Sequence, residues 1–156
     1  MTPADQARLL LRKAQQDEVI LQQLLDNQLI TDESLGFHAQ QAAEKLLKAL
    51  LTLHGLDYPR SHDLSVLLAL LGQGGVVLPD GLHQIADLTP MATLYRYEDL
   101  PLDVELPRSQ WTVWLAQLRS VVELSIESSA PAPPCGSPEG DRRRWGAGDP
   151  VDPNGT

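Results

Sequence analysis

The sequence contains one cysteine, Cys135, among its 156 residues. A single cysteine excludes an intramolecular disulfide, and no group of Cys and His residues has the spacing of a zinc site. We therefore expect neither a disulfide-stabilised fold nor a structural metal.

Long apolar segments are also absent from the sequence. No run reaches the roughly 18 to 20 consecutive apolar residues that a membrane-spanning helix requires. Residues 1–18 carry charges where a signal peptide would have its apolar stretch. The sequence therefore predicts a cytoplasmic protein.

Aromatic residues make up only 4% of the chain, and β-branched residues are sparse beside leucine and alanine. This composition favours helices over sheets. The length suits a single hydrophobic core. We expect an all-α domain.

Basic residues are the minority among the charges, with 12 Lys and Arg against 21 Asp and Glu, for a net charge of −9. Such a field repels a phosphate backbone, so non-specific nucleic-acid binding is disfavoured. Screening limits surface charges to about 8 to 10 Å, so a local basic pocket remains compatible with a small phosphorylated ligand.

The composition changes near residue 129. Residues 129–156 are rich in Pro and Gly and nearly free of aliphatic side chains. Such a segment cannot offset the entropy that ordering costs. We predict a helical domain over residues 1–128 and a disordered tail over residues 129–156.

Breaker residues divide the domain into helical blocks. Apolar residues recur at helical spacing, and the predicted helices cover residues 3–29, 31–55, 61–72, 80–95 and 109–127. Ser61 is the expected N-cap of the third, and Pro90 is expected to kink or divide the fourth. The sequence predicts an antiparallel, up-down bundle of four to five helices.

The second predicted helix carries a narrow polar strip. At about 100° per residue, Gln41, Glu44, Lys45 and Lys48 share one face, opposite a wide Leu and Ala arc. One interpretation is a solvated strip in which Glu44 and Lys48 form an i,i+4 pair. The other is a site in which the two lysines approach a phosphate or carboxylate beside Gln41.

The segment FHAQQAAEKLLKALLTLHGLDYPRSHDLSVLL, residues 37–68, resembles the signature of the HEPN superfamily of nucleotide-binding helical domains. That signature is a Q-x-A-x-E-K-x-x-K-A helix followed by a turn and His-Asp-Leu. An Arg-Tyr pair further along is matched by Arg96 and Tyr97. The resemblance covers about residues 5–128 and leaves the tail outside.

The resemblance implies a compact helical bundle, often a homodimer, that binds a nucleotide or a protein partner. The implied partner is a minimal nucleotidyltransferase, with which such domains form a toxin–antitoxin or nucleotide-handling pair. Tyr95 or Tyr97 would then contact the partner or receive a nucleotidyl group from it. Packing at the bundle edge is the alternative role for both tyrosines.

Ribonucleases of the superfamily are similar to one another in an Arg followed, after four to six residues, by a His. No Arg of this chain has a His at that separation, and Arg96 is followed by YEDLPL. We therefore assign no catalytic residue and expect no cofactor beyond a possible bound nucleotide.

The predicted site is a pocket for a nucleotide phosphate. Lys45, Lys48, His62 and Arg96 are expected to converge in it, with Gln41 and Arg60 beside them. His62 and Asp63 are also placed to begin a helix behind Ser61, which is the structural alternative for that pair. Two other functions stay open: a homodimeric scaffold without a small ligand, and a metal-independent ribonuclease toxin.

Overall fold

The computed structural model describes residues 1–101 and 106–131. These residues form five α-helices and two 3-10 helices and contain no strand, which confirms the predicted all-α class. The segment predicted as a disordered tail lies, from residue 132 onward, outside the described residues.

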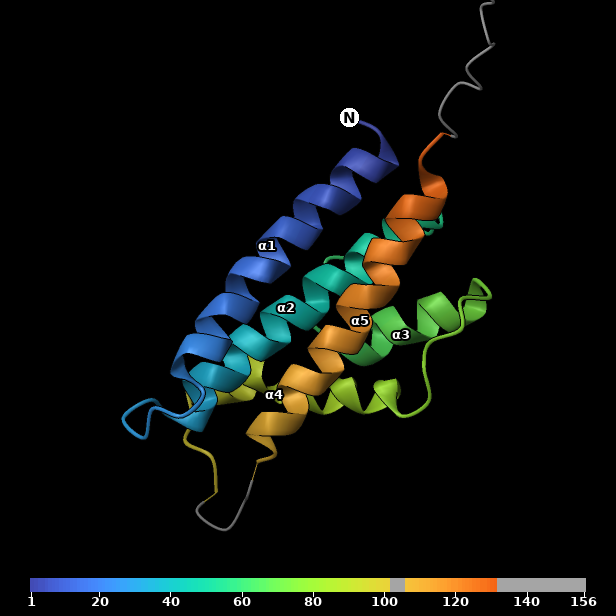
Figure 1. Ribbon diagram of the computed structural model, residues 1–156. Helices are drawn as coiled ribbons and strands as arrows, with labels where there is room; N and C mark the ends of the chain where they lie inside the picture. The colour runs from blue at the N-terminus through green and yellow to red at the C-terminus, as the bar shows by residue number, and fades with distance from the viewer. Residues whose placement is uncertain (102–105, 132–156) are drawn as a thin grey trace, which may run out of the picture.

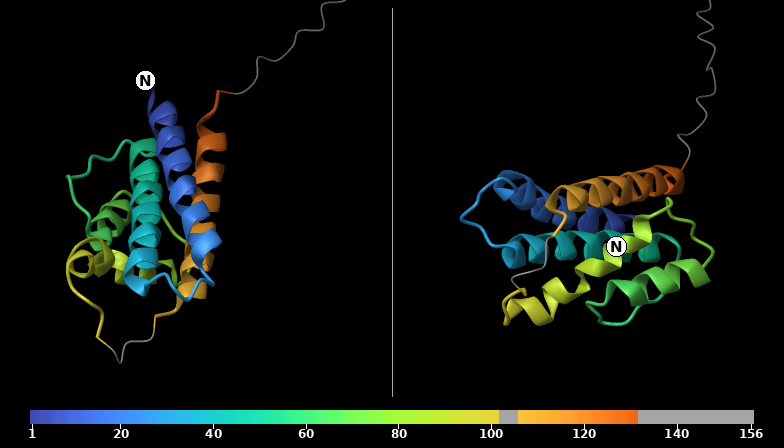
Figure 2. Two further views of the ribbon diagram at one scale, coloured as in Figure 1. Left: turned by 90° about the vertical axis from the view of Figure 1, so that its left-hand side faces the viewer. Right: turned by 90° about the horizontal axis from the view of Figure 1, so that it is seen from below.

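Three long helices lie side by side: α1 (Pro3–Leu24), α2 (Asp32–Leu53) and α5 (Arg108–Ser129). Helix α1 runs antiparallel to the other two (Figure 1). Helix α2 contacts both α1 and α5, and it also contacts the shorter elements on its other side. Those are α3 (Leu64–Gln73), η1 (Leu82–Leu88), α4 (Thr89–Ala92) and η2 (Leu94–Arg96). In Figure 2, α3 is inclined to the long helices, so the up-down arrangement belongs to the long helices only.

The first two helices begin where their caps predict. The Thr2 side chain accepts a hydrogen bond from the Asp5 N–H, the Asp5 carboxylate accepts one from the Thr2 N–H, and Pro3 occupies the first turn. Thr31 caps α2 by accepting from the Ser34 N–H. Helix α2 stops before Gly55, whose φ of 65° is the left-handed value that glycine tolerates best.

The prediction that the first helix reaches residue 29 is wrong, because α1 ends at Leu24. The side chain of Asn27 accepts a hydrogen bond from the Leu29 N–H at 2.9 Å, while the Asn27 N–H donates to the Leu24 carbonyl at 3.0 Å. The asparagine therefore forms a turn that competes with continued helix.

Ser61 is not the N-cap of α3. Asp63 is the cap, and its carboxylate accepts from the Ser65 N–H at 2.9 Å. Ser61 instead accepts from the Asp63 N–H at 3.0 Å. The helix starts at Leu64, so His62 lies in the preceding loop and not in the first turn.

The region predicted as a helix over residues 80–95, kinked or divided by Pro90, is three short pieces. The 3-10 helix η1 leads into the single turn of α4, where Pro90 occupies the start, and η2 follows. Proline lacks an N–H and is tolerated only in a first turn. Of the two predicted effects, Pro90 therefore divides the region by beginning a new helix and does not kink a long one.

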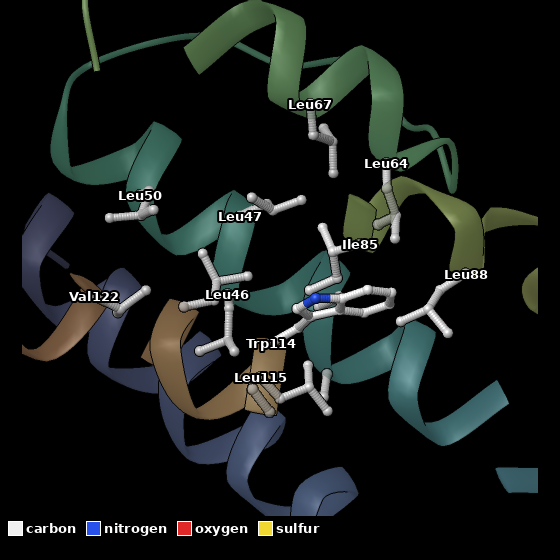
Figure 3. Packing of buried hydrophobic residues seen from close by; sticks show 14 of the residues in the cluster. Leu46, Leu47, Leu50, Leu64, Leu67, Ile85, Leu88, Trp114, Leu115 and Val122 are labelled. Atoms are coloured by element: carbon white, nitrogen blue, oxygen red, sulfur yellow. The ribbon is translucent and has the colours of Figure 1, made fainter. Parts of the chain in front are cut away.

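The core is formed around α2, whose leucines and alanines from Leu35 to Leu51 are all buried, while Leu53 is half-buried. Figure 3 shows Trp114 of α5 beside Ile85 and Leu88 of η1, with leucines of α2 and α3 around them. Along α5, Trp111, Trp114, Leu115, Leu118, Val122 and Ile126 are buried and Val121 is half-buried, whereas Leu124 is 63% exposed.

No helix within the described ranges has the length and apolar character that crossing a membrane requires.

Candidate functional site

The polar strip of α2 is not a freely solvated surface. Glu44 is 6% exposed, and its carboxylate accepts from Lys48 Nζ at 2.6 Å and from Gln40 Nε2 at 3.1 Å. The same carboxylate lies 2.9 Å from Nδ1 of His62. We call Gln40, Glu44, Lys48 and His62 the Glu44 cluster.

Glu44 is ionised in this cluster. Burial raises the pKa of Glu44, but the hydrogen bonds from Lys48, His62 and Gln40 together outweigh that effect, and the pKa lies below its usual value of 4.5. The ammonium of Lys48 also lies over the Tyr58 ring, 5.7 Å from its centroid. The positive charge of Lys48 is thus already matched within the protein.

Lys45 forms a separate ion pair with Asp17 of α1. The second oxygen of Asp17 lies 3.0 Å from Nδ1 of His38. Asp17 is mostly buried, with 13% of its side chain exposed, and it therefore neutralises Lys45 at the contact between α1 and α2.

Arg96 lies at a cavity beside the first turns of α2, which precede the polar strip. The cavity has a volume of about 290 Å³, and its described lining is Glu33, Ser34, Phe37, His38, Tyr95 and Arg96. The guanidinium of Arg96 lies over the rings of Phe37 and Tyr97, 5.2 and 5.6 Å from their centroids. We call this the Arg96 cavity.

One wall of the Arg96 cavity is fixed by Glu33. Its carboxylate accepts a hydrogen bond from the Leu100 N–H at 2.8 Å, which lowers the pKa of Glu33 and ties the segment after η2 to the first turn of α2. Arg96 has no carboxylate within ion-pair distance among residues 1–101 and 106–131. Arg96 is itself an exposed residue.

The remaining predicted residues are placed as follows. Gln41 donates to the Gln40 side chain at 2.8 Å, and Arg60 is exposed in the loop before α3. Tyr95 is half-buried against the core, whereas Tyr97 is 83% exposed.

These contacts divide the predicted site residues between two places. Lys48 and His62 meet at Glu44, whereas Arg96 and Tyr95 line a cavity whose described lining includes neither of them. Phe37 and Glu44 are seven residues apart on α2, which is about 10 Å along the helix axis. Lys45 belongs to neither place and is paired with Asp17.

Sequence reasoning missed Asp17, Phe37 and His38. Their spacing offered a partial signal, because Phe37, Gln41, Lys45 and Lys48 follow at intervals of three and four residues and therefore lie along one side of α2. Asp17 is on another helix, and nothing in its neighbourhood in sequence marks it as the partner of Lys45.

Metal ligation finds no support in the described part of the chain, where no group of three or more His, Cys, Asp and Glu residues is arranged to hold a metal ion.

Comparison with known proteins adds one finding. A protein-family model described as "HEPN domain" matches residues 7–128, which is most of the chain. Neither the curated proteins nor the solved structures include a significant match.

Proposed function

The chain belongs to the HEPN domain family, and from this premise we propose that it is a binding module for a nucleotide, held at the Arg96 cavity. This proposal rests on which of the predicted basic side chains are already paired with a carboxylate. Lys45 and Lys48 are each paired with a carboxylate, whereas Arg96 is exposed beside a cavity and has no acidic partner among the described residues.

The lining of the Arg96 cavity suits the parts of a nucleotide. A guanidinium binds phosphate through paired N–H donors, and the Ser34 hydroxyl supplies a further donor in the same lining. Phe37 and Tyr95 offer aromatic surface for a base. The volume of about 290 Å³ is at the lower end of small-molecule sites, which favours a mononucleotide over an oligonucleotide.

Isothermal titration calorimetry with AMP, ATP and GTP tests the proposal, with adenosine as the ligand that lacks a phosphate. We expect binding of at least one nucleotide and weaker binding of adenosine. Arg96→Gln removes a charge-assisted contact worth about 1.5–3 kcal/mol. The dissociation constant should therefore rise roughly ten- to hundredfold.

Two variants with the same charge change serve as controls. Arg12→Gln alters an exposed residue of α1, and Arg60→Gln alters the exposed loop before His62. Both should leave the dissociation constant within about threefold, the size of a screened long-range effect. Absence of heat with every nucleotide would overturn the proposal, and a loss with Arg60→Gln alone would move the site to the His62 loop.

A second function, pairing with a minimal nucleotidyltransferase, is favoured by the exposure of Tyr97. Tyr97 is 83% exposed next to Arg96 in the chain, whereas Tyr95 is half-buried, so Tyr97 is the better acceptor of a nucleotidyl group. If a nucleotidyltransferase is encoded beside this gene, incubation with it and ATP should add one nucleotidyl group, detected by intact mass. Tyr97→Phe should abolish the addition and Tyr95→Phe should not.

We also propose that the domain forms a homodimer. Sedimentation at micromolar concentration tests it, and a monomer there would remove the scaffold alternative.

A further inference from the structure

His62, in the loop before α3, is exposed to solvent and also contacts a buried carboxylate. The side chain of His62 is 60% exposed, yet its Nδ1 lies 2.9 Å from the carboxylate of Glu44, whose side chain is only 8% exposed. A carboxylate accepts and does not donate, so Nδ1 carries the hydrogen of this bond. The lone pair of the neutral ring is therefore on Nε2, the ring nitrogen that this contact leaves open.

The Glu44 cluster holds this orientation firmly. Gln40 Nε2 donates both to the Glu44 carboxylate at 3.1 Å and to the backbone carbonyl of His62 at 3.0 Å. One amide thus fixes both the acceptor of the ring and the backbone that carries the ring. Lys48 occupies the other oxygen of Glu44, which prevents the carboxylate from turning away.

The other three histidines lack this combination. His38 is also bound to a carboxylate, Asp17, but its side chain is only 29% exposed, against 60% for His62. His54 and His83 are exposed, and neither forms a side-chain hydrogen bond or ion pair within the described ranges. His62 alone in the described structure is both well exposed and oriented by a buried carboxylate.

We propose that His62 is a phosphoryl-acceptor site, in which Nε2 attacks the phosphorus of a phosphoramidate or an acyl phosphate. The N–P bond forms, the bond from phosphorus to the donor's leaving group breaks, and the leaving group takes the electron pair. No proton leaves the ring, because Nδ1 keeps its hydrogen toward Glu44. This site is separate from the Arg96 cavity and does not depend on nucleotide binding there.

The arrangement favours the product of this step over the free ring. Attack through Nε2 leaves the imidazole with the positive charge of an imidazolium, and the Glu44 carboxylate at 2.9 Å stabilises that charge as it develops. Arg60, exposed two residues earlier in the same loop, supplies a cation for the phosphoryl oxygens. These features select a phosphoryl group over a neutral electrophile.

Potassium phosphoramidate is the probe, applied to the full-length protein, with each histidine followed by peptide mass spectrometry under conditions that preserve N–P bonds. We expect His62 to be phosphorylated at least about tenfold faster than His54 or His83, which corresponds to about 1.4 kcal/mol in the barrier. NMR of the product should show the Nε2 isomer, because Nδ1 is occupied by Glu44. Equal rates at His62, His54 and His83, or an Nδ1 product, would overturn the proposal.

Glu44→Gln separates the carboxylate's charge from its hydrogen bond, since the amide oxygen still accepts from Nδ1. The rate at His62 should fall toward those of His54 and His83, whose rates should not change. Circular dichroism establishes whether this variant is folded. If Glu44→Gln does not fold, the proposal is tested by Arg60→Gln and by comparing the histidines within the wild-type protein. Arg60→Gln should slow phosphorylation of His62 alone. An unchanged rate at His62 would contradict the role of Arg60.

Discussion

Glu18 and Glu44 are each 6% exposed, yet the pKa values of their carboxyl groups shift in opposite directions. Burial raises the pKa of Glu18, with only Arg119 opposing and Glu123 adding to the rise. Arg119 Nε is 3.5 Å from Glu18 Oε2, and Glu18 Oε1 has no hydrogen-bond partner in the described structure. Glu44 is held by three donors, and its pKa falls. The number of donors, not the depth of burial, decides the direction.

At the residue scale we therefore expect Glu44→Gln to destabilise the fold at pH 7 by about 3 kcal/mol, because it leaves Lys48 partly buried without a charge partner. A lowered pKa in the folded state means that ionised Glu44 contributes stability above its unfolded value of about 4.5, and that this contribution is lost as the pH falls through the lowered pKa. Urea unfolding of variant and wild type from pH 7 to about pH 3 should show the difference shrinking with acid.

Glu18→Gln is the matched control because it makes the same chemical change at the same burial. The raised pKa of Glu18 means that the fold gains stability below the unfolded pKa of about 4.5 and loses it as the pH rises through the raised value. The stability of this variant relative to wild type should therefore increase with pH. Parallel pH trends in the two variants would contradict the assignment.

The residues of the candidate site were only partly predictable. The i,i+4 spacing of Glu44 and Lys48 correctly suggested their ion pair, and their place in the signature helix drew attention to them. The burial of Glu44 was not predictable, because it depends on the loop that brings His62 back onto α2. Periodicity describes one helix, whereas these contacts join segments 18 and 28 residues apart.

At the scale of single elements, the start of α3 rests on Asp63. Its side chain accepts from the Ser65 N–H at 2.9 Å, and Ser61 accepts from Asp63 itself at 3.0 Å. Asp63→Ala should destabilise the protein by about 1 kcal/mol, the usual effect of removing an N-cap. Ser61→Ala should cost less, because the hydrogen bond it removes lies outside the helix. Chemical denaturation of both variants measures the two losses, and a larger loss for Ser61→Ala would restore Ser61 as the cap.

The long helices were predictable within a few residues and the short elements were not. Helices α2 and α5 have caps or breakers at their ends and a broad apolar face, so pattern and structure agree. Residues 82–96 form 3-10 and α-helical turns of three to seven residues. Such short pieces have too few residues for a helical period to distinguish them from one long helix with a kink.

At the scale of the whole molecule, α2 is the element that all others cover. It contacts α1, α5, α3, α4, η1 and η2, and its leucines and alanines from Leu35 to Leu51 are all buried. Polar residues on such a helix are therefore brought against other elements even where the sequence suggests a solvated strip. This arrangement explains why Lys45 and Lys48 find carboxylate partners inside the protein, while Arg96, on the peripheral η2, pairs with no carboxylate of residues 1–101 and 106–131.

The three long helices are also joined at one end by Arg108, the first residue of α5. Its guanidinium forms an ion pair with Asp32 of α2 and donates to the backbone carbonyls of Leu25 and Ile30 at 3.1 and 2.9 Å. The Leu25 carbonyl lies at the end of α1, where no later turn supplies a donor. A single planar group therefore closes the end of α1, the α1–α2 loop and the start of α2 against α5.

Arg108→Lys should destabilise the protein by about 2 kcal/mol although it keeps the charge, because a lysine ammonium cannot reproduce three diverging N–H donors. Arg12→Lys, at an exposed position of α1, should change stability by less than about 0.5 kcal/mol.

Hydrogen exchange shows whether Arg108 stabilises this end of the bundle locally or the whole fold. If Arg108 is a tether for this end of the bundle, the amides of residues 25–31 should lose protection more than those in the middle of α2. Uniform loss along α2 would mean that Arg108 contributes only to global stability.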